Sequence, residues 1–403
     1  MNDKKDFLIS VVIPFHDRTN ILQLIFEKLQ DQTVLPKEII IVDSSTSDSA
    51  ERLISNYSTN QKVIYKRVKK SYPGKARNIG VELASGVWIA FLDSKTLPER
   101  NWLERYRYLI QAFHADAILG VTKFDAKTSF QKVLRAATYG KIGHHSVPGT
   151  LIRKKVFIDS GGYLEHVRMG EDIEWRQRLI KKNFNIHRPK KPIVNYNGLP
   201  ENFPSTVKKY LTSAYHTARL NILRNVKDAY LSLSLILSAI ILPKWNHLIV
   251  GWDTNPLFIP HVTKIYLMAL VCLLLIYQLV HYLFFRKMYQ TLFSRTLKLV
   301  VFIFITLAVY KWNAVIAGWM EDAVLYMPHI TKMYVGAVIL VSILYRGILL
   351  PLKRKVEPNY LFPFRWIQVG LVGLSLDLVK APGYIVGAIL PLLGVSHPRN
   401  SDA

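Results

Sequence analysis

Short apolar runs alternate with amphipathic segments through the first third of the chain. The runs are brief and mostly rich in β-branched residues, as buried strands are. They cover residues 7–13, 38–42, 63–65, 87–92 and 117–121. The segments between them place apolar residues at helical spacing, and they cover residues 20–32, 49–57, 75–84 and 101–113. This alternation predicts an α/β domain with a mostly parallel sheet and helices on both of its faces.

Beyond residue 227 the chain becomes far more apolar. Four runs stand out, at residues 229–242, 266–285, 297–310 and 333–352. The second and fourth reach the roughly 20 residues that an α-helix needs to cross the bilayer core. The other two are shorter and would span it only with the Trp-rich segments that follow them. We therefore expect one domain over residues 1–227 and an α-helical membrane domain over residues 228–403, with about four transmembrane helices.

The membrane domain contains two repeats. Lys-Trp-Asn at 244–246 recurs at 311–313, and Pro-His-x-Thr-Lys at 260–264 recurs at 328–332. Each repeat would hold a short span, a Trp-rich loop and a full span. Trp, Tyr and Lys favour the headgroup layer, so the loops are interpreted as interfacial anchors, with a pair of lipid- or glycan-gripping sites as the alternative. The apolar stretch 364–393 is interrupted by glycines and Pro382, which predicts a C-terminal interfacial helix or a re-entrant hairpin.

Charge sets the expected orientation and partners. Residues 286–298 and 353–355 are basic, so by the positive-inside rule these connections face the cytosol. The N-terminal segment lacks a signal peptide, so we expect a multi-pass protein of the cell membrane with its first domain in the cytoplasm. The net charge of +25 indicates an anionic partner. Membrane lipids match the apolar second half, whereas no nucleic-acid-binding signature is present, so nucleic acid is not expected.

Six motifs form an ordered set in the first half of the chain. They are VVIPFHDR at 11–18, IIIVDSSTSD at 39–48, GKARNIG at 74–80, IAFLDSKTLP at 89–98, GGY at 161–163 and GEDIEW at 170–175. In order and spacing, the set resembles the family-2 glycosyltransferases of the GT-A fold over residues 7–200. The resemblance implies a nucleotide-sugar-binding α/β domain. The Gln-x-x-Arg-Trp signature of processive synthases is missing, which argues against a polymer-extruding enzyme.

The resemblance also assigns roles to individual residues. Pro14, Phe15 and Asp17 belong to the strand end and loop that would wall the nucleobase, and Asp43 would accept a hydrogen bond from the base. Arg77 could reach the diphosphate, which a guanidinium grips bidentately. These residues are therefore predicted to bind the nucleotide-sugar. The alternatives are a helix-capping role for Asp43 and a solvated helix charge at Arg77.

One motif departs from the family pattern. Asp93 opens the D-x-D signature, which holds ribose and a divalent metal, but Lys95 occupies the third position. The histidine that often follows the Glu-Asp helix is also missing, since residues 194–197 read Val-Asn-Tyr-Asn. Asp93 and Lys95 are predicted to bind the nucleotide-sugar, and Asp93 is a candidate ligand for Mg²⁺ or Mn²⁺. The ammonium of Lys95 could instead contact the diphosphate in place of the ion.

The pair Glu171 and Asp172 would carry the chemistry. Asp172 matches the catalytic base of the family, which takes the proton of an acceptor hydroxyl while the anomeric carbon is attacked with inversion. A first-turn helix charge is the alternative. The sequence thus predicts an inverting glycosyltransferase that uses a nucleotide diphosphate-sugar donor in cell envelope glycan biosynthesis.

The predicted acceptor is membrane-associated: a glycolipid, a polyprenyl-linked glycan or a polyprenyl phosphate. A phosphate acceptor is already ionised, so the Glu171-Asp172 pair favours a hydroxyl. Because Lys95 departs from the family pattern, a catalytically silent GT-A-like membrane scaffold or regulator remains the alternative function.

Overall fold

The computed structural model describes residues 7–17, 19–57, 61–69, 71–220 and 330–392, with single positions between 244 and 311. The chain divides into two compact units. One contains Met1–Val226 together with Arg346–Ala403, and the other is Lys227–Tyr345. The predicted domain boundary at residue 227 stays a prediction, but the last part of the chain groups with the N-terminal unit.

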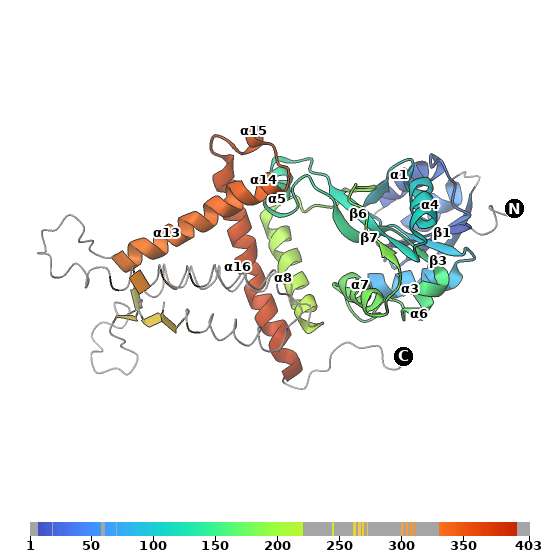
Figure 1. Cartoon of the computed structure of the whole chain (residues 1–403). Helices are drawn as coiled ribbons and strands as arrows, with labels where there is room; N and C mark the ends of the chain where they lie inside the picture. Colours follow the sequence, from blue (N-terminus) through green and yellow to red (C-terminus); the bar gives the residue numbers. More distant parts are fainter. Residues whose placement is uncertain are drawn as a thin grey trace, which may run out of the picture. The chain divides into compact units, whose positions relative to one another are not determined.

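A single mixed sheet forms the centre of the first unit (Figure 1). Over the described residues its strands lie in the order β3-β2-β1-β4-β7-β6-β9-β5, and β8 pairs with β6. Their bounds are β1 Ile9–Phe15, β2 Glu38–Asp43, β3 Lys62–Arg67, β4 Trp88–Phe91, β5 Thr96–Pro98, β6 Ala117–Phe124, β7 His144–Arg153, β8 Ile186–His187 and β9 Val194–Tyr196.

The first half of the sheet is wholly parallel, whereas its second half mixes parallel and antiparallel pairs. Strands β3, β2, β1 and β4 pair in parallel, as the alternation of strand and helix predicted. Strand β7 then runs antiparallel to both β4 and β6, and β5 runs antiparallel to β9. Most of the pairings are thus parallel, as predicted, but β7 and β5 introduce antiparallel pairs that the sequence did not predict. The residues of β7 read HHSVPGTLIR, and their proline and glycine hide the strand pattern in the sequence.

Eight helices accompany this sheet in the described part of residues 7–220. Helices α1 to α4 correspond to the four helical segments expected from the sequence, with ends that differ by a few residues, and α7 corresponds to the helix that begins at the Glu171-Asp172 pair. Their bounds are α1 Thr19–Gln30, α2 Ser49–Asn56, α3 Pro73–Leu83, α4 Trp102–Phe113, α5 Ser129–Thr138, α6 Lys154–Asp159, α7 Glu171–Lys181 and α8 Phe203–Arg219.

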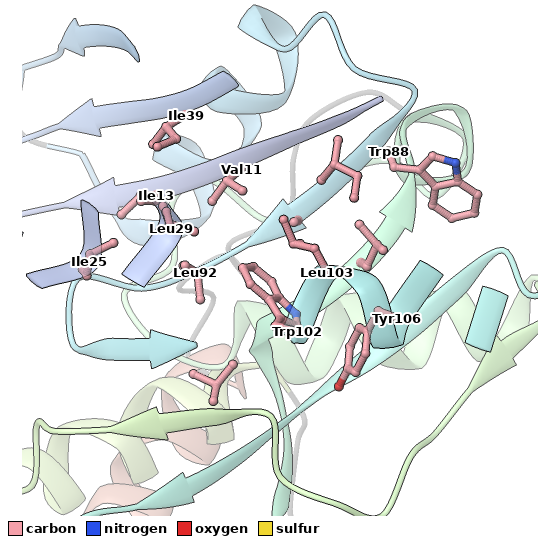
Figure 2. Close-up of a cluster of buried hydrophobic side chains, with 14 of the residues drawn as sticks. Val11, Ile13, Ile25, Leu29, Ile39, Trp88, Leu92, Trp102, Leu103 and Tyr106 are labelled. Atoms are coloured by element: carbon pink, nitrogen blue, oxygen red, sulfur yellow. The ribbon is translucent and has the colours of Figure 1, made fainter. Parts of the chain in front are cut away.

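Two hydrophobic clusters cover the two faces of the sheet. Alternate residues of β1 divide between them, because successive side chains of a strand point to opposite faces. Val11 and Ile13 join the cluster that α1 and α4 cover, and Figure 2 shows this cluster around Trp102. Val12 joins the cluster that α3, α6 and α7 cover, where Trp175 is fully buried. Helices therefore lie on both faces, as predicted, and the parallel half of the sheet is held rigidly between them.

The end of the chain forms one long helix. Short helices α14 (Leu350–Lys353) and α15 (Pro358–Leu361) lead into α16, which runs without a break over Arg365–Leu392. A re-entrant hairpin was one of two predictions for this stretch, and it is wrong. Helix α16 packs against α8 and α5. Gly383 and Gly387 allow this close approach, since a Cβ would lie 2.7 Å from the Leu211 carbonyl oxygen and 2.5 Å from that of Tyr215, respectively.

In the part of the chain that the structure describes, two apolar helices are long enough to cross a bilayer. One is Gly336–Lys353, which begins within α13 (Ile330–Leu344), and the other is Arg365–Gly387 in α16. By length and composition they favour membrane association, although a buried core helix meets the same criterion. The fourth predicted span coincides with the first of these helices. The other three predicted spans and both Trp-rich repeats lie largely outside the described residues.

Candidate active site

Three strand ends bring polar residues to one edge of the sheet. Strands β1 and β2 run in register, with Phe15 opposite Asp43. The main chain after β4 continues this alignment, because the amide of Leu92 donates to the carbonyl of Val12 at 3.1 Å. Parallel strands present their carboxyl ends together, where ligands of α/β proteins bind. The loops after β1, β2 and β4 therefore meet at one edge.

The predicted nucleobase residues form one group at this edge. Asp43 is buried, and its two oxygens accept from the Ser45 amide at 2.8 Å and from the Tyr65 hydroxyl at 2.9 Å. Burial and this hydrogen bond to Asp43 raise the pKa of Tyr65 well above its ordinary value. The amide of Asp17 donates to the Ser45 hydroxyl at 2.8 Å. This hydrogen bond ties the loop after β1 to the loop after β2. At the end of β1, Phe15 is buried and Pro14 is partly exposed.

Arg77 on α3 lies at the centre of a second group. One terminal nitrogen donates to Asp93 Oδ1 at 2.7 Å, and the other donates to Glu171 Oε1 at 2.9 Å. The guanidinium also stacks over the Tyr163 ring, 5.3 Å from its centroid. Arg77 is 4% exposed and Tyr163 is fully buried. Residues from four of the six motifs thus meet at one buried cation.

Asn78, next to Arg77, holds the GGY motif in place. Its side-chain amide donates to the Tyr163 carbonyl at 2.9 Å, and its side-chain oxygen accepts from the Tyr163 amide at the same distance. This pairing holds Tyr163 under the guanidinium. Burial opposes the charge of Arg77, but the carboxylates of Asp93 and Glu171 outweigh it and hold the pKa above its ordinary value. Arg77 therefore stays charged, and its predicted contact with a diphosphate would require one of these ion pairs to open.

Glu171 and Asp172 begin α7 and occupy different environments. Gly170 precedes them with a φ of 95°, a conformation that favours glycine, and the helix N-terminus favours their negative charge. The Glu171 side chain is 8% exposed and turns inward to Arg77. The Asp172 side chain is 32% exposed and lies 3.3 Å from Arg176 on the same helix. Asp172 is therefore the more accessible carboxylate of the pair.

The pKa of Glu171 is raised from its ordinary value of 4.5 to about 7. Burial is the main cause and the charge of Asp172 adds to it, while Arg77 acts in the opposite direction. The buried Glu171 therefore binds a proton more readily than a glutamate in water does.

Lys95 lies beside a second lysine that sequence patterns do not single out. Its side chain lies over Gly198, where an added Cβ would be 2.4 Å from Lys95 Cδ. The ammonium of Lys209, on α8, is 5.5 Å from the centroid of the Tyr196 ring. Burial and the charge of Lys95 lower the pKa of Lys209 to about 8. Two cationic side chains therefore lie near Tyr196 and Gly198, at the end of the short strand β9.

These residues fit a divalent cation poorly. One oxygen of Asp93 is already bound to Arg77, and the third D-x-D position contributes an ammonium group. Within the described ranges, no cluster of three His, Cys, Asp or Glu side chains could hold an ion. The third D-x-D position therefore presents a cation where a metal ligand would be needed.

Comparison with known proteins identifies the domain. The profile of Glycosyl transferase family 2 matches residues 10–169, which contain the Asp43 group and most of the Arg77 group. The chain carries a family-2 glycosyltransferase domain. Its α/β architecture with a mixed sheet is the GT-A-like fold that the motifs implied.

Several named glycosyltransferases resemble this family-2 domain. Glycosyltransferase AglE of Haloferax volcanii is 25% identical over 192 residues, which is 44% of this chain and 63% of AglE. The poly(ribitol-phosphate) beta-glucosyltransferase of Bacillus spizizenii is 31% identical over 121 residues, which is 28% of this chain and 19% of that enzyme. The chain thus spans less than two thirds of the length of these relatives.

A solved structure also aligns with the chain at low similarity. It is S. aureus TarS 1-349 in complex with UDP-GlcNAc, with a TM-score of 0.40 and 18% identity over 66% of this chain and 80% of that one.

The site contains residues that sequence reasoning did not assign. Asn78 and Tyr163 lie inside two of the recognised motifs, so their positions were visible although their contact was not. Tyr65 and Ser45 support Asp43, and only the fold brings Tyr65 there from the next strand. Lys209 had no signal, because it lies on an amphipathic helix outside the motifs. No hydrogen bond or ion pair described here links the Asp43 group to the Arg77 group.

Replacing Arg77 tests whether the buried cation holds the site together. We expect Arg77→Met to lower the free energy of unfolding by about 3–5 kcal/mol, because it leaves Asp93 and Glu171 without their partner. Arg100→Met is the matched control, since Arg100 pairs with Asp31 at 3.3 Å on the surface and such pairs contribute about 0–1 kcal/mol. Denaturant titration measures both variants. Equal, small losses would show that the Arg77 ion pairs are dispensable.

The raised pKa of Glu171 predicts a pH dependence. The folded protein binds this proton more tightly than the unfolded chain, so its stabilising effect is full below pH 4.5 and disappears as the pH rises through about 7. Unfolding should therefore become easier over that window. Glu171→Gln should remove this part of the dependence, and the difference between the two proteins in denaturant titrations at pH 4.5 and pH 7.5 measures it. Parallel curves for the two proteins would contradict the prediction.

Proposed function

We propose that this protein is an inverting glycosyltransferase that moves a sugar from a nucleotide diphosphate-sugar to a hydroxyl of a membrane-associated acceptor. The family-2 domain supports the reaction class. The proposed mechanism rests on the different environments of the two adjacent acids that begin α7. Glu171 is held inside by Arg77, while Asp172 beside it remains accessible. A base must reach the acceptor, so Asp172 is the residue proposed for that role.

The proposed reaction is a single displacement. Asp172 removes the proton of the acceptor hydroxyl as its oxygen attacks the anomeric carbon, and the bond from that carbon to the nucleoside diphosphate breaks. The configuration inverts because attack and departure occur on opposite faces. Arg176, 3.3 Å from Asp172, would hold the carboxylate in position. Glu171, fixed to Arg77, would keep the N-terminus of α7 against the D-x-D segment.

The nucleotide would lie along the sheet edge. Asp43, held by Ser45 and Tyr65, would accept a hydrogen bond from the base, and the Pro14–Phe15–Asp17 segment would wall it. The departing diphosphate develops negative charge that a cation must stabilise. Lys95 and Lys209 are proposed for this role because both are cationic and lie near each other at β9.

The membrane assignment of the acceptor rests on α8 and α16. Helix α8 carries Lys209 and packs closely against the apolar α16. An acceptor held at a membrane surface would thus be presented beside the proposed leaving-group site. We propose a multi-pass protein of the cell membrane with its catalytic domain in the cytoplasm, acting in cell envelope glycan biosynthesis.

Asp172→Asn tests the catalytic base. Donor binding should persist, because the amide keeps the shape of the side chain, whereas transfer should fall by about 10²-fold or more. A thermal-shift screen of UDP-, GDP- and dTDP-sugars first identifies the donor, and transfer is then measured with membrane extracts as acceptor. Glu82→Gln, an exposed position on α3, is the control. If the wild-type protein and Asp172→Asn bind donor but neither transfers sugar, the silent-scaffold alternative gains support.

Transfer in excess chelator tests the role of the lysines. We expect activity to survive chelation and Lys95→Ala to reduce it by about 10²-fold, the scale lost when a charge-stabilising group is removed. Lys66→Ala, on the exposed side of β3, is the control. The competing view is that Asp93 alone recruits a metal that arrives with the donor. Loss of activity on chelation and recovery with Mn²⁺ would establish that view instead.

A further inference from the structure

A cavity of about 640 Å³ lies between α5 and the α15–α16 segment. Its size is within the range of small-molecule sites in proteins. None of the residues assigned above to the donor or to the chemistry lines it. Its lining combines two kinds of side chain: the basic ones of Lys132, Arg135, Lys141 and Arg365, and the apolar ones of Phe130, Val133, Ala136, Val356 and Val372.

The polar side of the cavity is strongly cationic. It holds four basic side chains against one carboxylate, that of Glu357, which pairs with Lys141. Arg365 lies over the Tyr360 ring, 4.8 Å from its centroid, which fixes the guanidinium at the cavity wall. An excess of positive charge in a concave site concentrates anions there. A small hydrophilic anion such as free phosphate would make no favourable contact with the apolar residues of the lining.

The surface beside the cavity is unusually apolar. Large side chains on the same segment are exposed to an extent that water does not favour: Phe362 at 47%, Phe364 at 74%, Ile367 at 38% and Leu371 at 46%. Clusters of this kind mark contacts with a protein or a membrane. Basic residues beside exposed aromatic and aliphatic residues are the pattern of a segment that lies at a bilayer surface.

We propose that this cavity binds the headgroup of an anionic phospholipid. Lys132, Arg135 and Arg365 would hold the phosphate, because Lys141 is paired with Glu357. The apolar lining residues would contact the first part of the acyl chains, and the exposed apolar residues of α15–α16 would enter the bilayer beside it. A nucleotide-sugar matches the charge but not the apolar wall. The site is separate from the proposed catalytic site, so its occupant would be a structural lipid that holds the domain against the membrane.

Lipid binding by the full chain in neutral detergent tests the proposal. Mixed micelles that contain phosphatidylglycerol should bind saturably, and those that contain only phosphatidylcholine should not. The double variant Lys132→Gln/Arg365→Gln should lose about tenfold or more in affinity, the scale of two basic side chains at an anionic surface. Both side chains are exposed, so thermal unfolding and donor binding should remain as in the wild type.

The control removes two exposed charges elsewhere, in Lys69→Gln/Lys181→Gln. Retention of full affinity by the first variant, or equal losses in both, would reduce the effect to general charge and overturn the proposal. Competition by inorganic phosphate or glycerol 3-phosphate at concentrations similar to those of the lipid would assign the cavity to a free anion instead. Because the readout is binding, it is independent of whether the protein transfers sugar.

Discussion

The buried guanidinium of Arg77 is the interaction on which the candidate site depends. It contacts the D-x-D segment through Asp93, the start of α7 through Glu171, and the glycine turn through the Tyr163 ring. Each partner comes from a different part of the chain, so the cation sets the distance between three loops at once. A buried charge is costly unless it is paired, and here two carboxylates and an aromatic ring offset it, while Nε has no hydrogen-bond partner among the described residues. Removing either carboxylate would leave the interior cation with only one acidic partner.

The same ion pairs separate the two adjacent acids of α7 into different roles. Glu171 is drawn inward, and burial raises its pKa towards neutrality, whereas Asp172 faces the accessible side next to Arg176. Glu171 thereby becomes a structural ion-pair partner of Arg77, and Asp172 stays accessible for the proposed role of base. The helix N-terminus and Gly170 permit both orientations at consecutive positions. Structure and proposed reactivity are thus linked through one residue, since Arg77 decides which acid is buried.

Sequence patterns predicted the parallel half of the sheet and most of its helices, because apolar periodicity directly reflects burial there. They did not predict β7, whose proline and glycine interrupt the pattern, nor the continuous α16, where Pro382 and several glycines suggested a break. Motifs located Asp93, Glu171 and Arg77 but not their mutual contacts, because those join residues distant in the chain. Lys209 could not be found at all, since its proximity to Lys95 arises only when α8 packs beside β9. Long-range pairing, rather than local propensity, accounts for most of what was missed.

Helix α8 connects the two ends of the proposed mechanism. One part of it places Lys209 over Tyr196, next to the D-x-D segment, and another packs against Gly383 and Gly387 of α16 at backbone contact distance. A larger residue at either glycine would force these helices apart and shift α8 with them. Helix α16 begins at the cationic cavity and its exposed apolar margin, so a lipid bound there would fix the start of the same helix. The position of the proposed leaving-group lysine therefore depends on how α16 is held. In this arrangement, attachment to a membrane surface would also determine the geometry of the site that acts on a membrane-held acceptor.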